Sequence, residues 1–174
     1  MEEPEPPSSS PQPPAPVDPF DVDSIDGIVT ALYDSVSFAA GERPNWERFR
    51  SLFDPAALMV RVDPRQTSRP AAQRDGEPVR VSSIDDYMAR TTAAIDAGSL
   101  TAFVERELTR RTEVFADVAQ VFSTYERSAA AGEVRRGVNS MAMVKDGDRW
   151  RIVSLSWTDE TDEGPLPSRY LPRT

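Results

Sequence analysis

Apolar side chains recur at spacings of three and four residues in the first half of the chain, which predicts amphipathic helices. Residues 25–39 carry the clearest stripe, with Ser24 placed to cap the helix and Gly41 to end it. A shorter helix is expected after Pro44, and another over residues 83–98. The first two follow each other directly, so the chain is predicted to begin with a helical hairpin.

Beyond these helices the apolar pattern changes to the alternation that predicts strands. One short strand is expected over residues 57–62, and the polar residues 65–79 are interpreted as a loop over the mouth of a pocket. The Asp146-Gly147 pair is typical of a hairpin turn. Longer strands are expected over residues 100–115, 118–127, 135–145 and 149–158. Sequential strands with short turns predict an antiparallel meander, and hence an α+β fold.

Both faces of the predicted sheet carry apolar side chains. In the strand around Phe122, Val121 and Tyr125 lie on one face, while Val118 and Phe122 lie on the other. A sheet that is apolar on both faces needs a cover on each side. We expect the helices to cover one face and a second copy of the chain to cover the other, which predicts a homodimer.

Composition divides the chain into a leader, a domain and a tail. Residues 1–19 hold eight of the 16 prolines, four acids and no base, so they have little apolar area to offset the entropy of ordering. We expect a disordered leader over residues 1–19, one domain over residues 20–160 and a tail over residues 161–174. The tail is expected to fold back over the domain through Leu166, Tyr170 and Leu171. No signal peptide or membrane span is recognisable, so a cytoplasmic protein is expected.

Charge and missing residue types exclude several kinds of chemistry. The chain has 29 acidic and 20 basic residues, and its net charge of −9 disfavours nucleic acid as a partner because phosphate binding needs a basic patch. It has no cysteine and no histidine, which excludes thiolate nucleophiles, histidine-based triads and ordinary zinc or copper sites. No Gly-rich phosphate loop is present, so neither a nucleotide cofactor nor a metal is expected.

Four sequence segments, together with the order of the predicted helices and strands, point to a known family. They are IVTALYDSVSFAAG, FRSLFDPAALMV, VAQVFSTYE and RGVNSMAMVKDGDRWRIVSLSW. Together they resemble the nuclear transport factor 2-like superfamily, in its SnoaL-like and ketosteroid-isomerase-like branch, over residues 23–160. The resemblance implies a cystatin-like α+β barrel, in which a curved antiparallel sheet wraps around three helices, an apolar pocket lies between them, and dimers pack sheet to sheet. It implies no single activity, because the superfamily includes isomerases, cyclases, dehydratases and binding domains.

The resemblance also suggests two catalytic residues. In the ketosteroid isomerases a proton-shuttling aspartate followed by proline stands at the place of Asp63, and a tyrosine close to the place of Tyr33 donates to the oxyanion. An apolar pocket raises the pKa of a carboxyl group, and a phenol can stabilise an enolate. The second aspartate of the isomerases corresponds to Met141, which argues against steroid isomerisation. In the alternative interpretation, Asp63 ends a strand and Tyr33 packs in the core.

A second polar group lies on the predicted strands. Its members are Glu105, Glu107, Ser123, Tyr125 and Asn139. If these odd-numbered positions face into the cone, they line one wall with acids, a phenol and an amide that suit a polar group of a small molecule. Alternatively, the carboxylates pair with neighbouring arginines at the surface. The rest of the pocket wall is expected to come from Phe53, Met59, Tyr87, Phe103, Met141 and Trp157.

Three functional hypotheses follow from these patterns. The first is a dimeric pocket domain that binds a small, mostly apolar molecule as its ligand. The second is a cofactor-free isomerase, cyclase or dehydratase that works by proton transfer, with Asp63 as base and Tyr33 as donor. The third is a protein-interaction module whose Pro-rich leader recruits a partner. A buried Asp63 that points into an open pocket would favour the second hypothesis.

Overall fold

The computed structural model describes residues 17–129 and 132–172, so most of the expected leader lies outside the described residues. A short helix, α1 (Pro19–Val22), begins where the leader was expected to end. Val22 is buried against the neighbouring helix and belongs to the hydrophobic core. The boundary predicted between a leader over residues 1–19 and the domain stays a prediction, because most of the leader is not described.

The helices expected from the apolar spacing are present. They are α2 (Ile25–Val36), α3 (Trp46–Ser51) and α5 (Ile84–Asp96). Ser24, Asn45 and Ser83 cap them, because each side chain accepts a hydrogen bond from a backbone N–H in the first turn. Helix α2 ends before the expected stop at Gly41, since Phe38 has already formed a β-bridge with Phe103. None of the helices in the described residues is long and apolar enough to cross a membrane.

Six strands form one sheet in the order β2-β1-β6-β5-β4-β3. The strands are β1 (Phe53–Val62), β2 (Val79–Ser83), β3 (Phe103–Phe115), β4 (Val118–Ala129), β5 (Val134–Asp146) and β6 (Arg149–Asp159). All neighbouring strands are antiparallel except β1 and β6, which are parallel. The α+β fold class and the antiparallel meander of β3 to β6 are therefore confirmed.

The loop predicted over residues 65–79 is only partly a loop. It contains a short helix, α4 (Pro64–Thr67), and a 3-10 turn (Ala71–Gln73). It also ends in β2, which the sequence interpretation missed, and there Val79 pairs with Val62 of β1. Pairing with β1 stabilises this short edge strand, whereas its own sequence carries too few residues for an alternating pattern.

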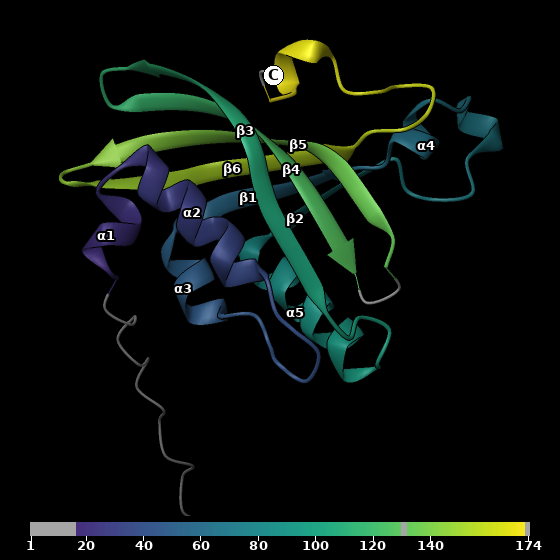
Figure 1. Ribbon diagram of the computed structural model, residues 1–174, viewed down its shortest axis with the longest axis horizontal. Helices are drawn as coiled ribbons and strands as arrows, with labels where there is room; N and C mark the ends of the chain where they lie inside the picture. The colour runs from purple at the N-terminus through teal and green to yellow at the C-terminus, as the bar shows by residue number, and fades with distance from the viewer. Residues whose placement is uncertain (1–16, 130–131, 173–174) are drawn as a thin grey trace, which may run out of the picture.

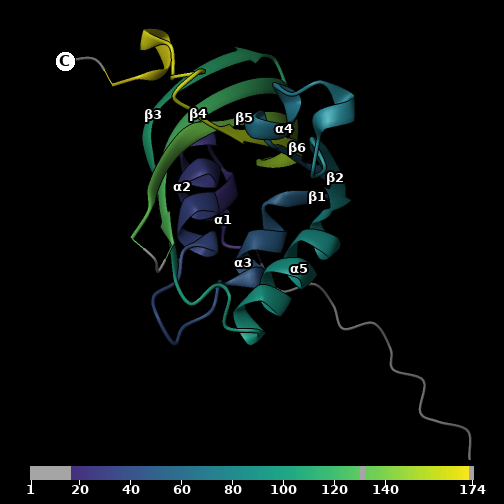
Figure 2. The ribbon, with the colours of Figure 1, turned by 90° about the vertical axis from the view of Figure 1, so that its right-hand side faces the viewer.

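The sheet curves around the helices. Figures 1 and 2 show α2, α3 and α5 on its concave side and the C-terminal tail on its convex side. Register shifts between Glu107 and Thr109 in β3, and opposite Ala142 and Met143 in β6, mark bulges. Bulges of this kind bend and twist a strand, so they contribute to the curvature. The concave face is the wall of the candidate site.

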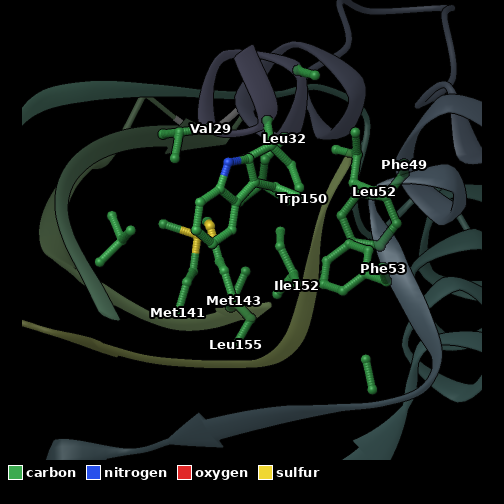
Figure 3. Packing of buried hydrophobic residues seen from close by; sticks show 14 of the residues in the cluster. Val29, Leu32, Phe49, Leu52, Phe53, Met141, Met143, Trp150, Ile152 and Leu155 are labelled. Carbon is green, nitrogen blue, oxygen red and sulfur yellow. The ribbon is translucent and has the colours of Figure 1, made fainter. Parts of the chain in front are cut away.

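The main core lies between α2 and the strands β5 and β6 (Figure 3). Val29 and Leu32 of α2 belong to the same cluster as Met141, Met143 and Ile152. Each of these side chains is at most 4% exposed. Burying such a side chain stabilises the fold by about 1.5–3 kcal/mol, so this cluster holds the helix on the sheet.

The C-terminal tail covers part of the convex face. Thr124 Oγ1 donates a hydrogen bond of 2.7 Å to the Tyr170 carbonyl oxygen, and the Tyr170 ring lies 6.0 Å from the Phe122 ring. The Leu166 N–H donates to Glu160 Oε2 at 3.2 Å. These contacts confirm that the tail folds back through Leu166 and Tyr170.

Candidate functional site

A cavity of about 220 Å³ lies between the concave face of the sheet and helices α2, α3 and α5. Most of its wall is aromatic or aliphatic, and its charged and amide groups come from β1 and from β3 to β5. The lining residues are Leu32, Tyr33, Val36, Phe49, Met59, Arg61, Tyr87, Phe103, Glu105, Tyr125, Arg127, Asn139, Leu155 and Trp157. We call this space the inner cavity.

The structure brings together most of the residues that the sequence singled out. The ones that line the inner cavity are Tyr33, Met59, Tyr87, Phe103, Glu105, Tyr125, Asn139 and Trp157. Phe53 and Met141, expected in the wall, are instead buried in the core. Glu107 and Ser123 lie behind the wall, where they bond to each other and, through Ser123, to Tyr33.

Strand alternation explains the wall and also two residues that the sequence interpretation missed. Tyr125 of β4 faces inward, so Arg127, two positions later, lies on the same face and lines the inner cavity. Arg61 stands in the same relation to Met59 on β1. The alternation that selected Tyr125 would have found Arg127 had it been continued to the end of the strand, and the same rule counted from Met59 would have found Arg61.

A chain of hydrogen bonds runs from the cavity wall into the protein behind it. Asn139 Nδ2 donates to Tyr33 Oη at 3.2 Å, and Tyr33 Oη lies 2.7 Å from Ser123 Oγ. Ser123 donates its one proton to Glu107 Oε1, 2.5 Å away, so Tyr33 must donate to Ser123. Burial also raises the pKa of the Tyr33 phenol above its ordinary value. In this arrangement the Tyr33 proton is not available to a ligand.

The bulge in β3 anchors the far end of this chain. Because the register with β4 shifts after Glu107, Glu107 and Arg110 lie on the same face. Arg110 donates to Glu107 Oε2 from Nε at 3.0 Å, and its Nη2 lies 2.8 Å from the same oxygen. Arg110 Nη1 also reaches Asp26 Oδ1 at 2.9 Å. Glu107 therefore pairs with an arginine, as the alternative interpretation allowed, but on the concave face.

Glu105 is the carboxyl group that stays available to the inner cavity. Its Oε1 accepts a hydrogen bond of 3.1 Å from Asn139 Nδ2, whereas its Oε2 accepts none from any described residue. Burial raises the pKa of Glu105 to about 7, against the opposing effects of the Asn139 hydrogen bond and the Arg127 charge. A carboxyl group with this pKa gains and loses its proton near neutral pH, which is common at functional sites.

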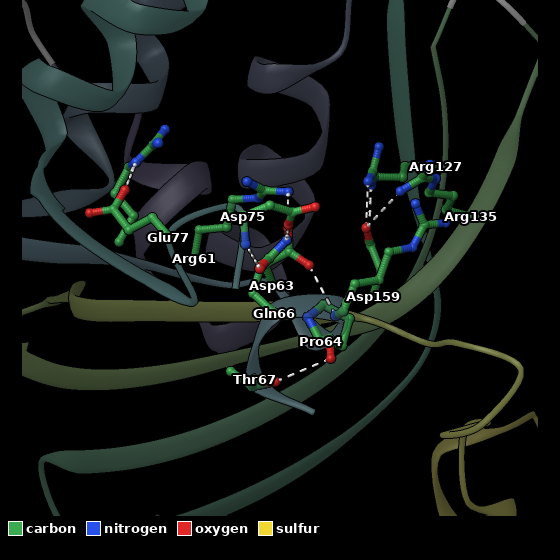
Figure 4. A network of polar contacts seen from close by, with 12 residues as sticks. Arg61, Asp63, Pro64, Gln66, Thr67, Asp75, Glu77, Arg127, Arg135 and Asp159 are labelled. Carbon is green, nitrogen blue, oxygen red and sulfur yellow. Dashed lines mark hydrogen bonds and ion pairs between the residues drawn. The ribbon is translucent and has the colours of Figure 1, made fainter. Parts of the chain in front are cut away.

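An ion pair forms the neighbouring part of the wall (Figure 4). Arg127 donates to Asp159 from Nε at 3.1 Å and from Nη2 at 2.6 Å, and Tyr125 Oη donates to Asp159 Oδ1 at 2.7 Å. Burial by itself would raise the pKa of Asp159, but the hydrogen bonds from Arg127 and Tyr125 outweigh it and hold this pKa below its usual value. The Arg127 charge is thereby balanced within the wall.

Asp63 lies outside the inner cavity. Its Oδ1 accepts a hydrogen bond of 3.0 Å from the Arg65 N–H, so Asp63 caps α4, with Pro64 in the first turn (Figure 4). Its Oδ2 lies 3.7 Å from Arg61 Nη2. Aspartate before proline is a strong helix start, and this local preference turns the carboxylate to the backbone. The structure therefore does not bring Asp63 and Tyr33 together as a catalytic pair.

The chemistry available at the inner cavity is limited and specific. Within residues 17–129 and 132–172, no group of three or more carboxylates is placed to hold a metal ion. The cavity combines aromatic walls, two arginines that each face an aspartate, Arg127 with Asp159 and Arg61 with Asp63, and one carboxyl group, Glu105, whose Oε2 is free of hydrogen bonds from described residues. Such a site suits one small molecule with a single polar end.

Comparison with solved structures identifies the fold. A candidate dehydratase of the nuclear transport factor 2-like family from Streptomyces avermitilis superposes with a TM-score of 0.53 at 17% identity, over 81% of this chain and 96% of that one. The beta subunit of a candidate aromatic-ring-hydroxylating dioxygenase from Novosphingobium aromaticivorans gives a TM-score of 0.54 at 15% identity, over 79% and 87%. No family model matches the chain, and no curated protein matches it in sequence.

The chain therefore has the nuclear transport factor 2-like fold, as the sequence resemblance indicated. More particularly, it is a small pocket domain of that fold, with the pocket between the curved sheet and its helices. At sequence identities of 15 and 17% the likeness to these structures shows the fold alone. The function has to be argued from the residues of the site.

Proposed function

We propose that the inner cavity binds one small, mostly apolar molecule whose oxygen-containing group meets Glu105. The observation that carries the proposal is the combination of aromatic walls with a single carboxyl oxygen, Glu105 Oε2, that has no hydrogen bond from any described residue. Ligand pockets are mostly apolar with a few convergent polar groups, and this cavity follows that rule.

The size of the inner cavity limits the ligand. At about 220 Å³ it lies below the roughly 300–1,000 Å³ of most drug-sized ligand pockets, so we expect a molecule of one or two rings. The two arginines of the wall each face a carboxylate, Arg127 with Asp159 at 2.6 Å and Arg61 with Asp63 at 3.7 Å, so the ligand need not carry a charge. A carbonyl group of the ligand would accept a hydrogen bond from protonated Glu105, and a hydroxyl group would donate a hydrogen bond to ionised Glu105.

Ligand-observed NMR with a library of small, uncharged ring compounds carrying a carbonyl or hydroxyl group tests this proposal. Val36 lines the inner cavity and is 7% exposed, so Val36→Phe fills it whereas Val36→Ala leaves it open. We expect compounds that bind the native protein to bind Val36→Ala as well, and to weaken by at least about tenfold with Val36→Phe. Equal binding to both folded variants would place the ligand elsewhere and contradict the proposal.

Proton transfer is a second candidate function, favoured by the pKa of about 7 for Glu105. In this second function Glu105, and not Asp63 as the sequence suggested, would be the general base. It would remove a proton from a carbon next to a bound carbonyl group. Ketones found in the NMR screen should then exchange that hydrogen for deuterium in heavy water in the presence of the protein. Exchange that is no faster than in buffer, or that persists in Glu105→Gln, would exclude this role.

We also propose that the chain forms a homodimer through the uncovered part of the convex face. Leu58, Val79 and Val81 lie together there on β1 and β2 and are 47%, 44% and 58% exposed. Exposed apolar clusters of this kind mark interfaces. In sedimentation experiments we expect a dimer that dissociates in Val81→Glu. Val114→Glu, at an exposed valine of the β3–β4 hairpin, is the control that should stay dimeric. A native monomer would contradict the proposal.

A further inference from the structure

A second cavity lies on the opposite face of the sheet from the inner cavity, and we call it the outer groove. It has a volume of about 360 Å³. Its floor is the convex face of β4 to β6, and its roof is the C-terminal tail, which passes over the sheet in Figure 1. The floor includes Phe122, Val138, Ser140, Ser156 and Thr158, and the roof includes Pro165, Leu166, Pro167 and Tyr170.

Hydrogen bonds and a ring contact attach the roof to the rest of the domain. At one end the Leu166 N–H donates to Glu160 Oε2 at 3.2 Å, and at the other end Thr124 Oγ1 donates to the Tyr170 carbonyl at 2.7 Å. The Tyr170 ring packs beside Phe122 with 6.0 Å between ring centroids. Pro165 and Pro167 stand on either side of Leu166 and stiffen this part of the roof, because the ring of proline fixes its backbone angle. The tail therefore spans the floor and leaves the groove beneath it.

The groove carries no unbalanced charge. Its acidic residues, Asp159 and Glu160, are each paired with an arginine, at 2.6 Å from Arg127 and at 2.6 Å from Arg136. Most of the remaining surface is apolar, which favours a neutral ligand because an ion would lose its hydration without gaining a partner.

Hydroxyl groups supply the polar contacts of the floor. Ser140 and Ser156 are directly opposite each other on β5 and β6, and Thr158 lies two positions further along. The Ser140 hydroxyl accepts from Gln120 at 2.9 Å, whereas the hydroxyls of Ser156 and Thr158 make no hydrogen bond with any described residue. They can donate to or accept from a ligand that lies on the floor.

We propose that the outer groove is a second binding site, separate from the inner cavity, for a neutral and mostly apolar molecule with a hydroxyl or carbonyl group. The roof stands over the floor, so the sheet of a second copy cannot pack directly on the floor while Thr124 donates its hydrogen bond to Tyr170. The volume of about 360 Å³ lies within the usual range for small ligands. The groove is formed only because the C-terminal tail folds back over the sheet, so the tail residues would be part of the binding site.

The neutral fluorescent probe 6-propionyl-2-(dimethylamino)naphthalene, which carries one carbonyl group, tests the proposal by titration of the full chain. Ser156→Phe places a ring in the floor of the groove, and Ser154→Phe places the same ring two positions earlier on the same strand, outside the groove. We expect Ser156→Phe to weaken probe binding by at least about tenfold and Ser154→Phe to leave it unchanged. Binding should persist in Val36→Phe, which fills the inner cavity.

Other results would overturn the outer-groove proposal. Equal probe binding by Ser156→Phe and Ser154→Phe would show that the probe does not occupy the groove, and loss of binding in Val36→Phe alone would place it in the inner cavity. Sedimentation of the same variants distinguishes a further occupant. If Ser156→Phe converts a dimer to a monomer while Ser154→Phe does not, the groove is an interface between copies of the chain, and the small-molecule proposal fails.

Discussion

Replacing Glu105 with glutamine should raise the free energy of unfolding by about 3 kcal/mol at about pH 8, and by less than about 1 kcal/mol at about pH 5. The pKa of Glu105 is about 7 in the folded protein against 4.5 as its ordinary value, because burial disfavours the charged form. Below about pH 4.5 the Glu105 side chain is protonated in both the folded and the unfolded state, so its raised pKa does not lower the stability. Between about pH 4.5 and 7 the unfolded chain releases its proton while the native protein keeps it, so stability falls as pH rises.

Glutamine resembles the protonated side chain and removes this dependence. Urea unfolding of both proteins at several pH values measures the difference directly. Glu107→Gln is the matched control on the same strand, since Glu107 pairs with Arg110 and accepts a hydrogen bond from Ser123. That change should destabilise the protein by about 1–3 kcal/mol at neutral pH, because it breaks a charge-assisted pair. A Glu105→Gln protein that is less stable than the native one at about pH 8 would contradict the account.

Replacing Gly137 with alanine should destabilise the protein by about 3 kcal/mol, a fall of roughly 10 °C in the melting temperature. Gly137 of β5 is directly opposite Tyr125 of β4. A Cβ atom at this position would lie 2.2 Å from the Thr158 carbonyl oxygen and 2.3 Å from Tyr125 Oη. The Tyr125 ring crosses this glycine to reach Asp159. Either the strand or the Tyr125–Asp159 hydrogen bond must therefore give way.

Gly76→Ala is the control for this change. A Cβ atom there would meet only the flexible Gln66 side chain, at 3.4 Å, so we expect an effect within about 0.5 kcal/mol. Thermal unfolding followed by circular dichroism gives the melting temperatures of the two variants and of the native protein for this comparison. If Gly137→Ala has the same melting temperature as the native protein, the Tyr125–Asp159 hydrogen bond does not require the Tyr125 ring to lie against the backbone of Gly137.

The sequence was sufficient to predict those parts of the fold that depend on local pattern. Residues 25–39 showed a helix period, and the alternation around Phe122 placed Val121 and Tyr125 on one face, where both are buried. Strand β2 was missed because an edge strand of five residues is held by its pairing with β1 and not by its own composition.

The candidate site was predictable as a set of positions but not in its chemistry. Glu105 and Glu107 follow the same alternation, yet the bulge after Glu107 brings Arg110 to one of them and leaves the other facing the inner cavity. A bulge has no clear signal in the sequence. Similarly, Asp63 had the residue type expected of a base, but the proline that follows it favours a helix cap.

The pKa of Glu105, followed by NMR of isotope-labelled glutamate carboxyl carbons as a function of pH, tests the central claim most directly. The claim is that the inner cavity holds a desolvated carboxyl group with one free oxygen, and it predicts a titration midpoint of about 7. The signal is assigned by its loss in Glu105→Gln. A midpoint near the ordinary value of 4.5 would show that water solvates Glu105 freely, and would contradict the account of the inner cavity as an enclosed binding site.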